Sequence, residues 1–260
     1  MHRSTLFRWK NAKPDWTIFQ IQAVIKPLFV ESDETYGSRR LSGALQQIGW
    51  EIGRRKTRKL MTDLQLKPHY PKVKYVRKPV ASFAENWLNQ VFDVLEKDTV
   101  WAGDITYIYT AEGWLYLAVV IDLFSRKIVG WHCSDEIDTS LCEQALRLAI
   151  HRRKPPRGLL FHSDRGSQYS SRAFRKCLAD FGIEQSQSRA GKCTDNAVTE
   201  RFFRSLKTEK LYRESYTTKA EAVVGVAEYI EDFYNPKRLH SSLGNLSPMM
   251  YEEQQMRLGH

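Results

Sequence analysis

Hydrophobic positions in the first quarter of the chain recur at helical spacing. A loose helical pattern covers residues 18–31, and two shorter patterns follow it. The apolar positions of the shorter patterns lie at i, i+3, i+4 and i+7, which is one face of a helix. They are Leu41, Ala44, Leu45 and Ile48, and then Thr57, Leu60, Met61 and Leu64. With the short turn at 50–53 between them, they predict a helix-turn-helix within about residues 36–66.

From Thr99 onward the pattern changes to short apolar runs rich in valine, isoleucine and aromatic residues. Three runs, at 100–110, 114–124 and 127–134, predict adjacent strands in a meander. Periodicity and breaker residues then predict helices at 141–150, 171–181, 195–211 and 219–234, with strands at 158–163 and 183–188. This order predicts the α/β class, with a mixed sheet flanked by helices.

The distribution of charge also distinguishes the N-terminal part of the chain, where helices are predicted, from the rest. The net charge is +10: residues 1–80 hold 17 Lys+Arg against 6 Asp+Glu, or +11, and residues 81–260 hold 23 against 24, or −1. A basic module joined to a near-neutral one indicates a polyanion-binding domain attached to a domain that does chemistry. A generally basic protein is the plainer alternative, and the asymmetry argues against it.

Basic residues gather near the start of the second predicted helix, where a recognition helix meets DNA. They are Arg54, Arg55, Lys56, Arg58 and Lys59. A basic helical hairpin that packs on another protein is the alternative. Residues 67–80 follow with three prolines, five basic residues and no period, which predicts an extended basic linker.

Composition narrows the class of protein. A hydrophobic content of 42% in 260 residues suits one sizeable core with a smaller accessory domain. The four cysteines form no C-x-x-C pair and no zinc pattern, which is typical of thiols in a reducing cytosol. Neither a signal peptide nor a run near the ~18 apolar residues of a membrane span is present, so we expect a cytoplasmic protein.

Three carboxylates carry the candidate chemistry. Asp104 is a lone acid inside an apolar strand, where burial without a partner is costly. Asp164 directly follows the strand at 158–163, at the end where ligands collect in open sheets. Glu200 lies in the first turns of its helix, on the face that also carries Arg204 and Lys207.

Separated carboxylates of this kind suit Mg²⁺, or Mn²⁺ in its place. Two such ions, about 3.5–4 Å apart, can activate an attacking oxygen and stabilise a leaving one in phosphoryl transfer. Arg204 and Lys207 are placed to hold phosphates. Taken singly, each acid is more simply a solvated or ion-paired residue. Asp122 and Asp195 compete for the same role, although Asp195 is better explained as a helix cap.

Four stretches in order resemble a known family: WAGDITYI, HSDRGSQYSS, GKCTDNAVTERFFRSLKTE and YNPKRLHSSLGNLSP. They are similar to the second-frame (OrfB) product of insertion-sequence-three family transposases, within the DDE transposase and retroviral-integrase superfamily. The resemblance covers roughly residues 36–251. YGSRRL and the basic helix after it also resemble the helix-turn-helix of that family, which adds Arg39 and Arg40 to the expected DNA contacts.

The resemblance implies an RNase H-like core with Asp104, Asp164 and Glu200 as catalytic metal ligands and Lys207 as the assisting basic residue. It implies two Mg²⁺ ions per active site, cutting at element ends and transfer of the 3′ strand. The implied partners are double-stranded DNA, at least one further copy of the chain, and an upstream-frame fusion partner. The expected location becomes the bacterial cytoplasm, at the nucleoid.

The expected domains are a helical DNA-binding domain at 1–66, a basic linker and lead-in helix at 67–97, an RNase H-like catalytic core at 98–235 and a C-terminal tail at 236–260. In the tail, we expect Arg238 and His240 to be exposed and to contact DNA. The tail either closes over the active site or simply caps the core. Tyr107 and Trp114 are expected in the core.

Two other functions remain open at this point. One is a non-catalytic DNA-binding regulator of its own element, with the acids buried in salt bridges. The other is a metal-dependent nuclease without strand transfer.

Overall fold

The computed structural model describes residues 16–69, 94–188 and 197–258. Contacts within the chain divide it into two compact units, 1–70 and 71–260, which are described separately. Most of the expected linker and lead-in helix, together with Cys193 and the expected cap Asp195, lies outside the described residues.

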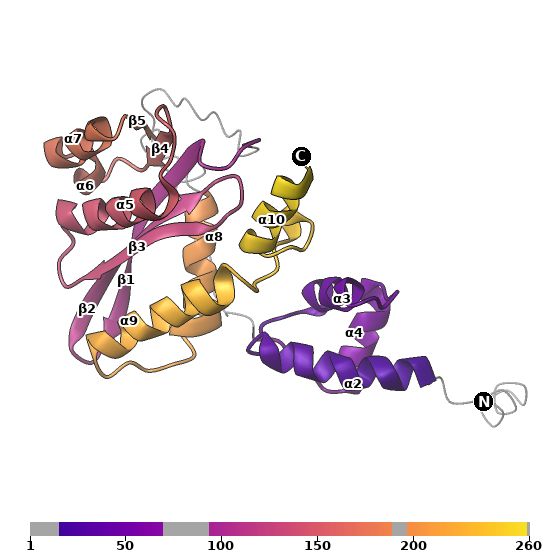
Figure 1. The fold of residues 1–260 in the computed structure, drawn as a ribbon. Helices are drawn as coiled ribbons and strands as arrows, with labels where there is room; N and C mark the ends of the chain where they lie inside the picture. The colour runs from indigo at the N-terminus through magenta and orange to yellow at the C-terminus, as the bar shows by residue number, and fades with distance from the viewer. Residues whose placement is uncertain (1–15, 70–93, 189–196, 259–260) are drawn as a thin grey trace, which may run out of the picture. The chain divides into compact units, whose positions relative to one another are not determined.

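Within residues 16–69, the first unit contains three helices, α2 (Trp16–Glu31), α3 (Ser38–Gln47) and α4 (Arg54–Asp63), labelled in Figure 1. Its core includes most of the apolar positions that the periodicity picked out: Ile21, Ile25, Phe29, Leu41, Leu45, Leu60 and Met61. Ile48 is an exception, because α3 ends at Gln47 and Gly49 then turns the chain with a φ of 93°. The two predicted helices and their turn are confirmed.

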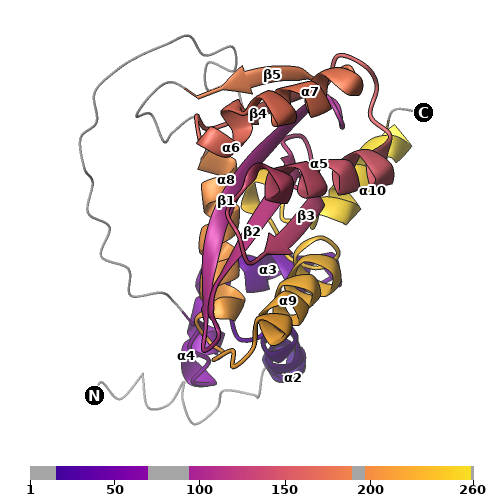
Figure 2. The ribbon, with the colours of Figure 1, turned by 90° about the vertical axis from the view of Figure 1, so that its left-hand side faces the viewer.

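The second unit is built on one mixed sheet of five strands in the order β3-β2-β1-β4-β5. The strands are β1 (Val100–Thr110), β2 (Gly113–Asp122), β3 (Ile128–Ser134), β4 (Leu160–Ser163) and β5 (Glu184–Gln187). The first three form the predicted antiparallel meander, and β4 and β5 add in parallel to β1. Figure 2 shows β4 and β5 at one end of the long strand β1.

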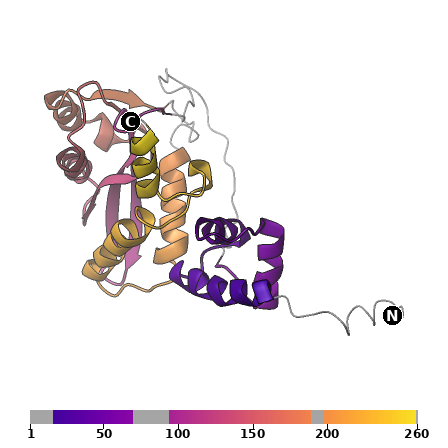
Figure 3. The ribbon, with the colours of Figure 1, turned by 45° about the vertical axis from the view of Figure 1, so that its right-hand side comes forward.

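Helices cover both faces of this sheet (Figures 1 and 3). On one face, α5 (Thr139–Arg153), α6 (Ser167–Ser170) and α7 (Arg172–Asp180) enclose a core around Trp101, Phe161 and Phe174. On the other face, α8 (Ala197–Leu206) and α9 (Lys219–Ala227) enclose a core around Phe202 and Ile230. The predicted α/β class, with a mixed sheet flanked by helices, is confirmed.

Two predicted helices change character part-way along. α8 passes into a π-helical segment, η2 (Lys207–Leu211), where the Tyr212 amide donates to the Lys207 carbonyl at 2.8 Å. α9 passes into η3 (Glu228–Tyr234), where the Asn235 amide reaches the Ile230 carbonyl at 3.1 Å. A π-turn adds one residue to a helical turn, so it rotates the residues that follow and often occurs at functional sites.

The sequence patterns predicted neither the short α6, nor the 3₁₀ turn η4 (Ser241–Leu243), nor α10 (Pro248–Leu258). The stretch PMMYEEQQMRL has no clear apolar face, and the buried positions of α10 include the acid Glu252. Its placement therefore depends on a polar contact made by that acid. None of the described helices is long and apolar enough to cross a membrane.

Candidate active site

Parallel pairing of β1 with β4 aligns two of the candidate acids. Residues 100–102 of β1 pair with residues 160–162 of β4, a constant offset of 60 positions. Continued two residues further, this offset sets Asp104 level with Asp164, which directly follows the end of β4 at Ser163. The parallel register therefore brings together two acids that are 60 residues apart in the sequence.

Backbone amides hold one oxygen of each aspartate. Asp104 Oδ1 accepts a hydrogen bond from the amide of Ile105 at 2.8 Å, and Asp164 Oδ1 accepts one from the amide of Gly166 at 2.9 Å. A Cβ atom at residue 166 would lie 3.0 Å from that same Asp164 oxygen. The glycine of the RGSQY turn therefore leaves room for the carboxylate to sit over the backbone.

Glu200 and Lys207 enter from α8 on the opposite side of β1 from α5. Phe202 and Leu206 are buried against the sheet, and this packing fixes the rotation of the helix. Glu200 in the first turn is exposed, and Lys207 begins the π-helical segment two turns later. The charges of both side chains act on Asp104, so α8 brings them to the same region as the two aspartates.

Electrostatics set Asp104 apart from an ordinary surface acid. Burial raises the pKa of Asp104 to about 7; the bond from Ile105 opposes this rise, and the charges of Asp164 and Glu200 add to it. Burial also raises the pKa of Glu200. Uncompensated negative charge at this place favours either a proton or a cation.

Lys207 provides positive charge beside these acids. Burial lowers its pKa, and the negative charge of Asp104 partly offsets that effect. Its Nζ atom lies 4.4 Å from the ring centre of Tyr107, a cation–π contact. The ammonium group is therefore held close to the acids, and no ion pair with a described carboxylate is present.

The donor set suits a hard divalent cation, since all three side chains offer carboxylate oxygens. Within residues 16–69, 94–188 and 197–258, however, no three His, Cys, Asp or Glu side chains are gathered closely enough to hold an ion. The raised pKa of Asp104 is the observation in favour of such an ion, because a bound cation would relieve the repulsion among the acids.

Sequence reasoning missed a buried pair behind the aspartates. Tyr169 is fully buried and hydrogen-bonds to Cys142 of α5, and the negative charges of Asp104 and Asp164 both reach its hydroxyl. Burial and those charges raise the pKa of the phenol well above its usual value. The position of Tyr169 in the same SDRGSQY motif as Asp164 was the one available signal.

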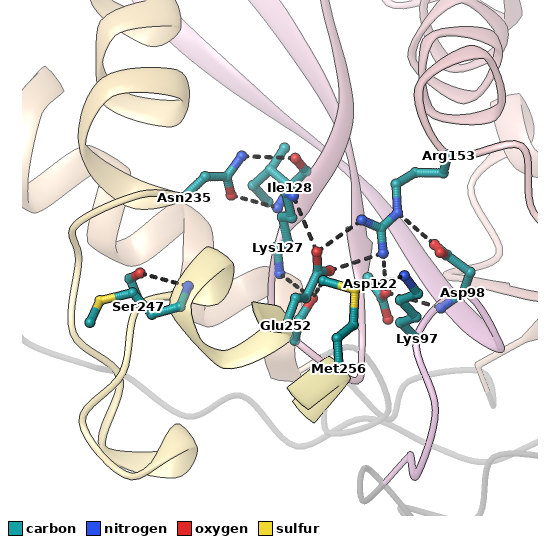
Figure 4. Close-up of polar contacts among 12 residues, drawn as sticks. Lys97, Asp98, Asp122, Lys127, Ile128, Arg153, Asn235, Ser247, Glu252 and Met256 are labelled. Atoms are coloured by element: carbon teal, nitrogen blue, oxygen red, sulfur yellow. Dashed lines mark hydrogen bonds and ion pairs between the residues drawn. The ribbon is translucent and has the colours of Figure 1, made fainter. Parts of the chain in front are cut away.

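A second group of acids in the same unit is neutralised by one arginine, Arg153, shown in Figure 4. Its guanidinium lies 2.8 Å from Asp98, 3.3 Å from Asp122 and 2.9 Å from Glu252 of α10. Glu252 also accepts from Lys127 at 3.2 Å. Asp122, which competed with the three candidate acids on sequence grounds, is thus occupied in holding α10 on the core.

The tail is therefore fastened to the core in the manner of a cap. Besides the contacts of Glu252, the Met249 amide of the tail donates to the carbonyl of Asn235 at 3.1 Å. The Asn235 side chain is itself held to the core by two hydrogen bonds with the backbone of Ile128, at 2.9 and 3.0 Å (Figure 4). Of the two expectations for the tail, the structure supports the cap on the core.

The expectation that Arg238 is exposed is wrong. Only 5% of its surface is accessible, and its guanidinium pairs with Glu209 at 2.7 Å and with the Ser205 hydroxyl at 2.7 Å. The π-turn η2 places Glu209 inward, where a buried acid requires a cation. His240 is half-buried and lies 3.4 Å from Arg238.

The expected burial of Tyr107 and Trp114 is also wrong. Their exposed fractions are 58% and 48%, and the two rings meet edge to face at 5.2 Å. They lie on the far part of the β1–β2 hairpin, beyond the point where β4 ends.

In the first unit, α4 has an apolar inner face and a basic outer face. Thr57, Leu60 and Met61 are buried, whereas all five basic residues of the helix are exposed: Arg54, Arg55, Lys56, Arg58 and Lys59. Arg39 on α3 is exposed, and Arg40 lies over the ring of Tyr36 at 5.5 Å. This arrangement leaves the charge of α4 open to a polyanion.

Comparison with known families assigns both units. Residues 95–193 and 181–248 match models of the integrase core domain, and residues 19–74 match an HTH-like domain. All three candidate acids lie within the two integrase core matches.

Several proteins resemble the chain along most of its length. It is 37% identical to the insertion element IS600 uncharacterized 31 kDa protein of Shigella sonnei, over 96% of this chain and 94% of that protein. It is 39% identical to the transposase for insertion sequence element IS904 of Lactococcus lactis, over 88% and 92%. It is 38% identical to transposase InsF for insertion sequence IS3A of Escherichia coli, over 90% and 82%.

A solved structure supports the fold. A chain of the simian T-cell lymphotropic virus intasome, in complex with PP2A regulatory subunit B56 gamma, matches with a TM-score of 0.52 at 16% identity, covering 87% of this chain and 73% of that one. The RNase H-like core that the motifs implied is confirmed. With an HTH-like unit, an integrase core and relatives that match nearly end to end, the chain belongs to the insertion-sequence-three family of transposases.

Proposed function

We propose that the chain cuts the ends of its own insertion element and transfers the resulting 3′ strands, with Asp104, Asp164 and Glu200 as the metal-binding acids. The observation that carries this proposal is the contrast between Asp104 and Asp122. Burial raises the pKa of both to about 7, but Asp122 pairs with Arg153. Asp104, in contrast, has the charges of Asp164 and Glu200 beside it and no ion pair with a described residue.

The acids would hold Mg²⁺, or Mn²⁺ in its place, with two ions per active site. When bound, such ions supply an activated attacking oxygen and a stabilised leaving oxygen. The register of β1 and β4 sets Asp104 level with Asp164 just past the end of β4, and α8 adds Glu200 from the helical layer. Lys207 binds a non-bridging phosphate oxygen and orients the scissile phosphate.

The reaction consists of two displacements at phosphorus. In cleavage, a water oxygen bonds to phosphorus, and the bond to the 3′ oxygen of the element strand breaks, which leaves a 3′-hydroxyl. In transfer, that hydroxyl attacks a target phosphate and the target's own 3′ oxygen departs. Two ends must meet in transfer, so the working form contains at least two copies of the chain. A fusion to an upstream-frame product would add a further DNA-binding domain.

The non-catalytic alternative requires the acids to be neutralised in salt bridges. Asp104, Asp164 and Glu200 make no ion pair with any residue that the structure describes, unlike Asp98, Asp122 and Glu252. This contrast favours a site that binds a cation.

The test uses the full chain, Mg²⁺ and a labelled duplex of the element's terminal sequence. Wild-type protein should nick the duplex and join its 3′ end to target DNA, and EDTA should stop both steps. Asp164→Asn should remove both steps and keep DNA binding. Asp180→Asn changes an exposed acid at the end of α7 and serves as the matched control. Strand transfer that survives Asp164→Asn would sink the assignment.

DNA recognition is assigned to the basic face of α4. Replacing Arg54, Arg55 and Lys56 with alanine should weaken duplex binding and flatten its salt dependence by about 0.9 log units per log salt for each lost phosphate contact. Because all three side chains are exposed, the fold should be preserved. Unchanged affinity would contradict this role.

A further inference from the structure

A pocket of about 200 Å³ lies beside α8, and ten of the described residues line it. Three arginines, Arg126, Arg201 and Arg238, line it together with His240, Ser205 and Ser242, and none of the ten is acidic. A water molecule takes about 30 Å³ of liquid volume, so the pocket has room for a tetrahedral anion.

This pocket is distinct from the three carboxylates. At about 100° per residue, Lys207 lies within roughly 20° of Glu200 around the helix axis, whereas Ser205 lies about 140° away. Arg201 and Ser205 line the pocket, and Glu200 and Lys207 do not. The helix α8 therefore separates the two sites.

One wall of the pocket is rigid. Arg238 is buried, its charge is balanced by Glu209 at 2.7 Å, and its Nη2 donates to Ser205 at 2.7 Å. Glu209 does not line the pocket. Arg238 therefore shapes the wall, and Arg201 adds a positive charge from the exposed part of α8.

Arg126 enters from a fixed turn between β2 and β3. It adopts a left-handed backbone conformation with a φ of 61°, and its amide donates to the Asp122 carbonyl at 2.8 Å. Ser125 and Lys127 on either side are held by Glu252. The backbone that carries Arg126 is thus anchored by the Arg153 cluster of Figure 4.

We propose that this pocket binds a phosphate group, supplied by the backbone of the DNA away from the reacting phosphate. Guanidinium groups match phosphate oxygens with paired, charge-assisted hydrogen bonds, and serine hydroxyls donate to the same oxygens. The choice of DNA as the source of the phosphate rests on the proposed function. The ability of the pocket to bind a phosphate group is independent of that function, since free pyrophosphate presents the same group.

Two variants at accessible positions test the pocket and leave its buried wall intact. Arg201→Gln removes a positive charge, and Ser242→Glu places an acid among the arginines. Both residues are exposed and line the pocket. The matched controls are Arg175→Gln on α7 and Ser241→Glu, the exposed neighbour of Ser242 that does not line the pocket.

In the first arm, duplex affinity is measured at several salt concentrations in the full chain carrying Asp164→Asn, so that no DNA is cut. Each pocket variant should reduce the slope of log affinity against log salt by about 0.9, the value of one phosphate contact, and the controls should not. In the second arm, calorimetry measures pyrophosphate binding to the same proteins.

A slope change in the pocket variants alone supports DNA as the source. Loss of pyrophosphate binding in those variants, with unchanged DNA slopes, supports a free phosphate compound. Equal changes in variants and controls, or no change in either arm, would overturn the proposal. Failure of strand transfer in wild-type protein would refute the proposed function. The salt slope of duplex affinity and the binding of pyrophosphate would still test the pocket, because neither measurement requires strand transfer.

Discussion

Two groups of three acids occupy the same α/β unit, and their positive partners distinguish them. Asp98, Asp122 and Glu252 surround Arg153 at 2.8 to 3.3 Å. Asp104, Asp164 and Glu200 make no ion pair with a described residue, and the charge of Lys207 acts on Asp104. A fixed guanidinium neutralises the first group and makes it structural. The second group keeps its negative charge available for a cation from outside the chain.

The pKa of the central acid does not separate the two groups. Burial raises the pKa of Asp104 and that of Asp122 to about 7 in both cases. For Arg153, burial acts to lower its pKa, and the bonds to Glu252 and Asp98 outweigh this and raise it. The two groups therefore differ in whether the fold itself supplies a cation that pairs with the acids. The following predictions test that distinction, starting with the largest expected effect.

Replacing an aspartate with asparagine should reduce strand-transfer activity in the candidate site much more than in the arginine cluster. Asp104→Asn should lower strand transfer by about 1000-fold, since metal-site interactions contribute several kcal/mol at about 1.4 kcal/mol per tenfold in rate. Asp98→Asn, in the arginine cluster, should keep activity within about tenfold once folded. Comparable losses of strand-transfer activity in the two variants, measured with folded protein, would contradict the distinction between the two groups.

Removing the arginine should destabilise the fold strongly. Arg153→Met leaves the buried acids Asp98 and Asp122 without a cation and Glu252 with Lys127 alone, and breaking a buried pair costs about 3–5 kcal/mol. Urea unfolding followed by tryptophan fluorescence should report the loss. Arg152→Met is the matched control, because its ion pair with Glu231 is exposed on both sides and should contribute less than about 1 kcal/mol.

The pH dependence of stability should show that the Asp104 carboxylate has no cation of its own within the fold. Its pKa in the folded state, about 7, exceeds the ordinary value of 3.8, so the folded state binds more protons than the unfolded state between these pH values, and stability falls as pH rises through them. Without divalent ions, Asp104→Asn should therefore stabilise the protein above pH 7, by at most about 4 kcal/mol at 1.4 kcal/mol per pKa unit, and not below pH 4. Thermal melting at both pH values checks this. An equal effect at both would contradict it.

The smallest effect is expected at the rim of the arginine cluster. Lys127→Met removes one partner of Glu252, which keeps Arg153 at 2.9 and 3.0 Å and Ser125 at 2.8 Å. The expected loss is about 1 kcal/mol in urea unfolding. A loss as large as that of Arg153→Met would show that Lys127, and not the arginine, holds α10.

Local sequence determined the elements because periodicity reports burial within one segment. The spacing of Leu60 and Met61 predicted the inner face of α4, and the β-branched runs predicted β1 to β3. Asp104, Asp164 and Glu200 were chosen as the candidate site because their motifs resemble a family. Spacing alone could not have told them from Asp122.

The tertiary structure decided which charges are neutralised, because a charge can find its partner anywhere along the chain. Arg153 and Glu252 are 99 residues apart, and Arg238 and Glu209 are 29 apart. Neither pairing produces a periodic pattern in the sequence. We therefore expected Arg238 to be exposed and did not predict the helix α10. The sequence by itself determined the order of the elements and the acids that accompany them. Folding decided which acids and arginines satisfy one another, and so which remain available to metal and phosphate.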